Sequence, residues 1–126
     1  MKAVCLDSSG WIEIVLDGPN AKKFAKALSA PLIVSSISIY EIARYTTREV
    51  GEDASQALLA FIQQYPVVDV TAELALAASD LGSRYKLAMA DSLIYATALT
   101  HNATLWTQDD DFQDLPHVKF FPKIQS

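Results

Sequence analysis

Short apolar segments of strand length alternate with longer helical patterns along this chain of 126 residues. Strands that are apolar along their whole length are typical of parallel sheets covered on both faces. The alternation therefore predicts an α/β fold, with a roughly five-stranded, mainly parallel sheet flanked by helices on both faces. The expected strands cover residues 3–6, 32–34, 67–70, 103–106 and 118–121.

Six helical patterns separate these strands. Pro19 is expected to begin the second helix, because a missing N–H is no loss in the first turn. The last helix is apolar on nearly all sides, which predicts that it is internal. The expected helices cover residues 9–16, 19–29, 36 or 38 to 50, 53–64, 72–85 and 90–101.

Length and composition predict a single domain over residues 1–126. Half of the residues are apolar, which argues against disorder. Cys5 is the only cysteine, so it cannot form an internal disulfide, and we expect a buried thiol within a strand. The first apolar run is too short for a signal peptide, and no run is long enough to cross a membrane. We therefore expect a cytoplasmic protein without membrane contact.

The net charge is −5, from 10 basic and 15 acidic residues. This balance argues against capture of nucleic acid by the surface as a whole. It is compatible with a concentrated acidic site whose charge is cancelled by bound cations.

Four acidic residues are expected at the same edge of the predicted sheet. Asp7 follows the first strand and Asp109 follows the fourth. Glu41 is expected in the first turn of the helix after the second strand, and Asp91 at the start of the last helix. Right-handed crossovers bring the carboxyl ends of parallel strands to one edge, where α/β folds bind ligands. The topology thus predicts that four carboxylates converge.

Each acid also has a purely structural interpretation. Asp7 and Asp91 could be helix N-caps. Ser38 and Glu41 match the S-x-x-E capping box. The run of aspartates at 109–111 could be a polar turn. A shared functional site explains four acids at one edge better than four separate structural roles do.

Clustered carboxylates repel one another, and one of them is forced to hold a proton unless a cation binds. Mg²⁺ and Mn²⁺ favour carboxylate oxygens and keep waters for a phosphate substrate. The chemistry that fits is attack of a metal-activated water on a phosphodiester. No His, Cys or Lys is obviously placed as a nucleophile beside this site.

Four segments carry a resemblance to a known family: VCLDSSGWI, SISIYEIARY, MADSLIYATA and ATLWTQDDDF. In order and approximate spacing the chain resembles the PIN-domain nucleases over residues 2–122, and among them most the VapC-type toxins of bacterial toxin–antitoxin pairs. The resemblance implies a PIN-like domain that acts as an Mg²⁺- or Mn²⁺-dependent endoribonuclease on single-stranded or looped RNA.

The resemblance also implies roles for individual residues. Ser9 and Thr107 match small hydroxyl positions that orient carboxylates through hydrogen bonds. The fourth acid stays open between Asp109 and Asp111, with Asp109 preferred, while Asp110 is expected to be a solvated turn residue. The matched acids, which would hold the metal, are Asp7, Glu41, Asp91 and Asp109 or Asp111.

The expected partners are RNA, a second copy of the chain and a VapB-like antitoxin that inhibits the enzyme. Arg44 is expected either to contact RNA or to pair with Glu41 on the same helix face. Aromatic residues near the acids could stack on bases. For Trp11 and Tyr40, however, core packing is the preferred interpretation.

Other classes of protein fit less well. A haloacid-dehalogenase-type phosphatase needs an aspartate where this chain has Ser9. A response-regulator receiver domain needs paired acids near the first strand and a late lysine at the site, and Lys119 is poorly placed. A module that binds RNA or protein without cleavage stays open as an alternative.

Overall fold

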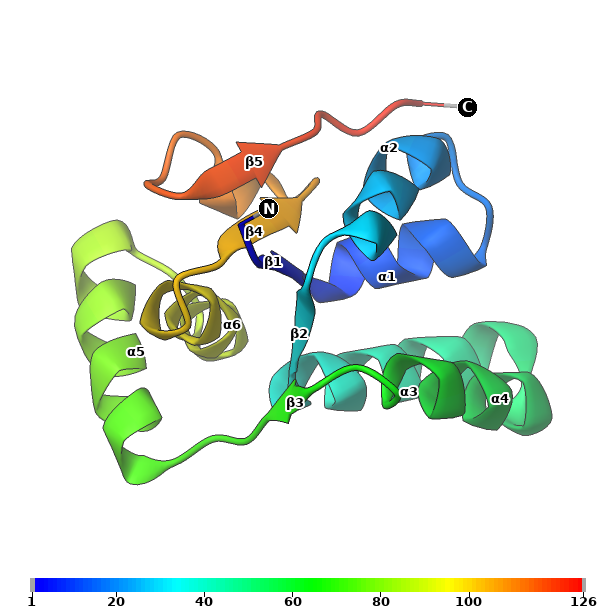
Figure 1. Cartoon of the computed structure of the whole chain (residues 1–126), viewed down its shortest axis with the longest axis horizontal. Coiled ribbons are helices and arrows are strands. Elements are labelled where there is room, and N and C mark those ends of the chain that lie inside the picture. The colour runs from blue at the N-terminus through cyan, green and yellow to red at the C-terminus, as the bar shows by residue number, and fades with distance from the viewer. Residues whose placement is uncertain (1, 126) are drawn as a thin grey trace.

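A parallel sheet of five strands forms the centre of the computed structural model, which describes residues 2–125 (Figure 1). The strand order is β3-β2-β1-β4-β5, and all four pairings are parallel. The predicted fold class is therefore confirmed. The strands are β1 (Val4–Leu6), β2 (Leu32–Ser35), β3 (Val67–Val68), β4 (Thr104–Thr107) and β5 (Val118–Phe120).

Helices cover the sheet on two sides (Figure 1). On one side lie α1 (Ser8–Val15), α2 (Ala21–Ala25) with the 3₁₀ turn η1 (Lys26–Ser29), α3 (Ser36–Val50) and α4 (Glu52–Ile62). On the other side lie α5 (Ala72–Tyr85) and α6 (Met89–Thr100). The helices α3 and α4 pack along each other, as do α5 and α6.

Successive residues of β1 serve the two faces of the sheet, because side chains alternate along a strand. Val4 and Leu6 are buried in the core beneath α1 to α4. Cys5 is fully buried in the core on the side of α5 and α6, as expected of a buried thiol. Its register partners, Ile33 and Leu105, pack in the same core. The two cores thus hold the short strand in one register.

The helix α6 is internal, as its sequence predicted. All of its residues from Ser92 to Ala98 are buried. It contacts the sheet and also α5. Gly82 allows the close approach of α5, because a Cβ there would lie 2.6 Å from the Ser92 hydroxyl oxygen. This packing holds the start of α6 in a constant position.

One predicted helix start is wrong, and of the two starts expected for the next helix, Ser36 and Ser38, the structure has Ser36. Pro19 does not begin a helix: it lies in a turn, and α2 begins at Ala21 with Asn20 as its N-cap. The capping box at Ser38 is also absent, because α3 begins earlier, at Ser36, and its N-cap is Ser35. The Ser35 hydroxyl accepts a hydrogen bond from the Ile37 N–H. β2 therefore passes directly into α3 without a loop.

No helix within residues 2–125 has both the length and the apolar character needed to cross a bilayer.

A candidate metal site formed by carboxylates

A cavity of about 260 Å³ opens at the carboxyl edge of the sheet. Four acids that sequence analysis placed there line it together, although they come from four different elements. Leu6 and Thr107 end neighbouring strands, so the chain leaves β1 and β4 at the same edge. The lining residues are Asp7, Ser8, Ser9, Ile12, Glu41, Tyr45, Asp91, Ile94 and Asp109.

Asp7 is held by hydrogen bonds at both carboxylate oxygens. Its Oδ1 accepts from the Ser9 hydroxyl at 2.7 Å and from the Gly10 N–H at 3.0 Å. Its Oδ2 accepts from the Thr107 hydroxyl at 2.6 Å. The bond from Gly10 makes Asp7 the N-cap of α1, so the structural interpretation also holds. Capping and lining the cavity are compatible because both fix the same carboxylate.

Burial raises the pKa of Asp7 to about 6, even though its hydrogen bonds act in the opposite direction. The carboxylate is only 5% exposed, so its charged form loses most of its hydration. The negative charge of Asp109 is a smaller cause that raises the pKa in the same direction. A bound cation would offset both effects, because its positive charge favours the ionised form of Asp7.

Glu41 lies in the second turn of α3 rather than in the first, because the helix starts at Ser36. Its Oε1 accepts a hydrogen bond from the Ser8 hydroxyl at 2.6 Å. Ser8 is the first residue of α1, so this bond joins α1 to α3 across the ends of β1 and β2. Ser8 was not among the residues predicted for this site. The only available signal was its place beside Asp7.

Asp91 lies in the first turn of α6, but it is not the N-cap as considered above, since Ala88 occupies that position. The pKa of Asp91 is raised to about 7, chiefly by desolvation and to a smaller extent by the charges of Asp109, Asp111, Glu41 and Asp7. The same carboxylates that line the cavity therefore repel Asp91. Electrostatic repulsion of this kind is what a divalent cation relieves.

The three consecutive aspartates have different environments. Asp109 lines the cavity, and its backbone N–H donates to the Thr107 hydroxyl oxygen at 2.9 Å. Its Oδ1 accepts from the Asp111 N–H at 3.0 Å, which turns the chain into the short 3₁₀ helix η2 (Asp110–Phe112). Asp110 is exposed outside the cavity, as expected, and Phe112 is fully buried.

Two overlapping groups of acids occur at this site: the four that line the cavity, and a group of three whose oxygens lie close together. One oxygen each from Asp91, Asp109 and Asp111 lies within 4.8 Å of the others. Among residues 2–125 this is the only group of three potential metal ligands. Asp111 is exposed and does not line the cavity, whereas Asp7 and Glu41 do. Both groups share Asp91 and Asp109, which makes these two the common centre.

The donor set fits a hard divalent cation. The three carboxylate oxygens lie within 4.8 Å of one another, close enough for one Mg²⁺ with metal–oxygen distances of about 2.1 Å to be held between them. The lining residues include no histidine or cysteine, the ligands that favour zinc or copper. The charged groups and their spacing therefore suit Mg²⁺ or Mn²⁺.

Two predictions about neighbouring residues need correction. Tyr40 does not pack in the core, because 58% of it is exposed. Arg44 forms no ion pair with Glu41 within the described part of the chain, and instead donates to the Tyr40 hydroxyl at 3.0 Å. Trp11 is fully buried, as expected.

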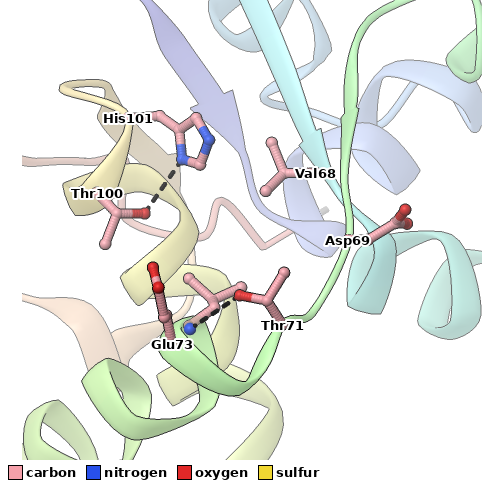
Figure 2. A pocket seen from close by; sticks show the side chains of 7 residues that line it. Val68, Asp69, Thr71, Glu73, Thr100 and His101 are labelled. Carbon is pink, nitrogen blue, oxygen red and sulfur yellow. Dashed lines mark hydrogen bonds between the residues drawn. The ribbon is translucent and has the colours of Figure 1, made fainter.

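A larger cavity of about 350 Å³ lies elsewhere, between the end of β3, the start of α5 and the end of α6 (Figure 2). The side chains of Asp69, Glu73 and His101 line it from three separate segments and stand apart from one another (Figure 2). The His101 Nδ1 is already within 3.1 Å of the Thr100 hydroxyl. Size alone therefore does not identify the reactive site.

Cys5, the only cysteine, lies two residues before Asp7, but its thiol is not a usable nucleophile. Burial raises its pKa to about 12, and the charge of Asp7 adds to this effect. At neutral pH the thiol is protonated and closed off from solvent.

A family model described as "PIN domain" matches residues 4–118. The chain belongs to the PIN-domain family. This match includes all the acids at the cavity and almost the whole sheet. No match is found among curated protein sequences.

Solved structures with the same PIN fold include a toxin–antitoxin complex from Klebsiella pneumoniae, with 22% identity and a TM-score of 0.83 over 96% of this chain and 99% of that one. VapC20 of Mycobacterium tuberculosis, a sarcin-ricin loop cleaving toxin, has 18% identity and a TM-score of 0.76 over 90% and 95%. VapBC-1 from nontypeable Haemophilus influenzae has 20% identity and a TM-score of 0.71 over 95% and 97%. At these identities the likeness establishes the fold.

Proposed function

We propose that this PIN domain is a metal-dependent endoribonuclease that hydrolyses RNA phosphodiesters. The observation that carries the proposal is the convergence of Asp7, Glu41, Asp91 and Asp109 on one cavity. The raised pKa values of Asp7 and Asp91 support it, because they mark carboxylates that lack a counter-charge. The cofactor we propose is Mg²⁺ or Mn²⁺.

In this mechanism the four acids would hold the cation, with Asp111 as a further ligand at the exposed side. A cation bound there would lower the pKa of a coordinated water and offset negative charge on the phosphodiester. Ser9 and Thr107 keep the Asp7 carboxylate in one orientation through their hydrogen bonds. Ser8 does the same for Glu41 and leaves its Oε2 free to bind.

We further propose that the enzyme is the toxin of a toxin–antitoxin pair and that a VapB-like antitoxin inhibits it. The shared fold with VapC20 and with the VapBC-1 complex supports this proposal. The acidic cavity suits a partner that inserts a basic side chain. A homodimer and action on RNA in the cytoplasm are parts of the same proposal.

The direct test is cleavage of total cellular RNA by the purified, antitoxin-free protein. We expect cleavage with Mg²⁺ or Mn²⁺ and none with EDTA. Asp91→Asn should abolish cleavage while the circular dichroism spectrum stays unchanged. Asp110→Asn is the matched control, because it removes an equal charge from an exposed neighbour outside the cavity and should keep full activity.

Two outcomes would contradict the proposal. Absence of metal-dependent cleavage across total RNA, with binding retained, would favour a module that binds without cleaving. Equal activity of the Asp91→Asn and Asp110→Asn proteins would remove the cavity from the reaction.

A further inference from the structure

The helix that carries Glu41 also carries a row of aromatic and basic side chains, of which Tyr45 is half-buried and the others are exposed. Arg44, Tyr45 and Arg48 follow Glu41 at steps of three, four and seven residues, and therefore lie along the same side of α3. Tyr40 lies beside this row, four residues before Arg44. We call Tyr40, Arg44, Tyr45 and Arg48 the α3 ridge. Seven residues of helix extend about 10 Å, so the ridge leads away from the cavity.

The side chains of the ridge form two aromatic–arginine pairs. The Arg44 guanidinium lies 5.9 Å from the centre of the Tyr40 ring and donates to its hydroxyl at 3.0 Å. The Arg48 guanidinium lies 5.4 Å from the centre of the Tyr45 ring. Tyr45 also lines the carboxylate cavity, so the ridge is continuous with the site. These contacts hold the rings in place, while 58% of Tyr40 stays exposed.

The two arginines of the ridge differ in whether an acidic side chain pairs with them. Arg48 is paired with Glu49 at 3.1 Å, although both side chains are largely exposed and such a pair contributes little. Arg44 is exposed and has no acidic partner among residues 2–125. The Arg44 guanidinium is therefore a cation without a counter-ion, one helical turn from Glu41 at the acidic cavity. An exposed ring beside an unpaired guanidinium offers a base a stacking surface and a phosphate a partner.

We propose that the α3 ridge binds the unpaired RNA strand next to the phosphate being cleaved, and that it sets the preference for single-stranded over duplex RNA. Tyr40 stacks on a base and Arg44 binds a phosphate of the same strand. Tyr45, at the edge of the cavity, contacts the nucleotide between them and the metal site. Bases paired in a duplex cannot stack on these rings. The inference rests on the proposed nuclease function.

The test is equilibrium binding of a short, unstructured, fluorescent RNA to the inactive Asp91→Asn protein at a series of salt concentrations. Arg44→Gln should reduce the slope of log K against log salt by about 0.7, the value for one lost phosphate contact on a single strand. Tyr40→Leu should weaken binding about 5- to 150-fold with little change in slope. Binding of a duplex of the same sequence should change far less in both variants.

Matched controls separate these effects from general loss of charge or apolar surface. Arg84 is an exposed arginine on α5 that pairs with Asp80 at 3.0 Å, so Arg84→Gln should keep the wild-type slope. Phe61 is a part-exposed aromatic residue on α4 outside the cavity, so Phe61→Leu should keep the affinity.

The inference is overturned if Arg44→Gln has the same slope as Arg84→Gln, if Tyr40→Leu binds as tightly as Phe61→Leu, or if the Asp91→Asn protein binds no RNA. If the ridge variants keep their affinity for RNA but lose affinity for a co-expressed antitoxin, the ridge binds a protein partner instead. Cleavage by otherwise wild-type protein is measured in parallel. If it persists while ridge variants bind normally, only this inference fails and the nuclease proposal stands.

Discussion

The Thr107 hydroxyl donates a hydrogen bond of 2.6 Å to Oδ2 of Asp7, and so joins two residues that are 100 positions apart in the chain. Thr107 is the last residue of β4, and Asp7 follows the last residue of β1. The same hydroxyl oxygen accepts the Asp109 N–H. One buried side chain thereby fixes the position of two of the acids.

Thr107→Val should shift the pH profile of cleavage toward alkaline pH. The threonine hydrogen bond lowers the pKa of Asp7, so its loss raises that pKa and more alkali is needed to deprotonate the carboxylate. We also expect activity at neutral pH to fall about 10- to 100-fold, as is typical when a group that orients a metal ligand is removed. The measurement is kcat/KM against pH. Thr97→Val is the control, because the buried Thr97 hydroxyl donates only to the Leu93 carbonyl, away from the cavity. An unshifted pH profile for Thr107→Val would contradict the role of Thr107 in lowering the pKa of Asp7.

Ser8→Ala should weaken metal binding about 10- to 100-fold, because the Glu41 carboxylate loses the bond that restricts its rotation. Titration of the protein with Mn²⁺ in a calorimeter measures this directly. Exposed Ser79 on α5 supplies the matched control, Ser79→Ala, with an expected wild-type affinity. Equal affinities for the two variants would show that the Ser8–Glu41 bond is not needed for the site.

Single Asp→Asn changes at positions 109, 110 and 111 should separate the three aspartates. Asp109 lines the cavity, so its loss should remove most activity. Asp111 lies within 4.8 Å of the other ligand oxygens but is exposed, so its loss should weaken metal affinity and cost less activity. Asp110→Asn should leave both activity and metal affinity unchanged. Steady-state kinetics at several Mg²⁺ concentrations distinguishes the three, and greater loss in Asp111→Asn than in Asp109→Asn would reverse the assignment.

The metal-free protein should become less stable as the pH rises from about 4 to about 7. Folding raises the pKa of Asp7 from 3.8 to about 6 and that of Asp91 to about 7, so in this range the folded chain binds more protons than the unfolded one. The protonated carboxyls stabilise the fold fully below pH 4, and this contribution is lost as the pH passes through the raised values. For buried Asp7 alone the change is roughly 3 kcal/mol in the free energy of unfolding.

Thermal unfolding with EDTA or with Mg²⁺ across this pH range measures the effect. Mg²⁺ should raise the Tm at pH 7 and have little effect at pH 4, because only the charged carboxylates bind it. Asp91→Asn should unfold at a higher Tm than wild type in EDTA at pH 7 and should respond weakly to Mg²⁺. A metal-free Tm that rises between pH 4 and pH 7 would contradict the proposed repulsion.

The convergence of the acids at one edge of the sheet could be predicted from the sequence, because it depends on the order and direction of the strands. Alternating strands and helices, all connected in parallel, bring the ends of β1 and β4 to one edge whatever the details of packing. The starts of α2 and α3 were less predictable. Pro19 and Ser38 both carry signals typical of a helix start, but Asn20 and Ser35 hold those positions. Such signals are short, and a neighbouring residue can cap the helix instead, as Ser35 does by accepting the Ile37 N–H.

The sequence by itself determined the α/β class, the edge at which Asp7, Glu41, Asp91 and Asp109 meet, and the family. Only the tertiary structure decided which groups hold these acids, because the Ser8–Glu41 and Thr107–Asp7 bonds join residues 33 and 100 positions apart. It also decided that Tyr40 is exposed beside Arg44 instead of buried, since the direction of a helical side chain depends on which face the rest of the fold covers.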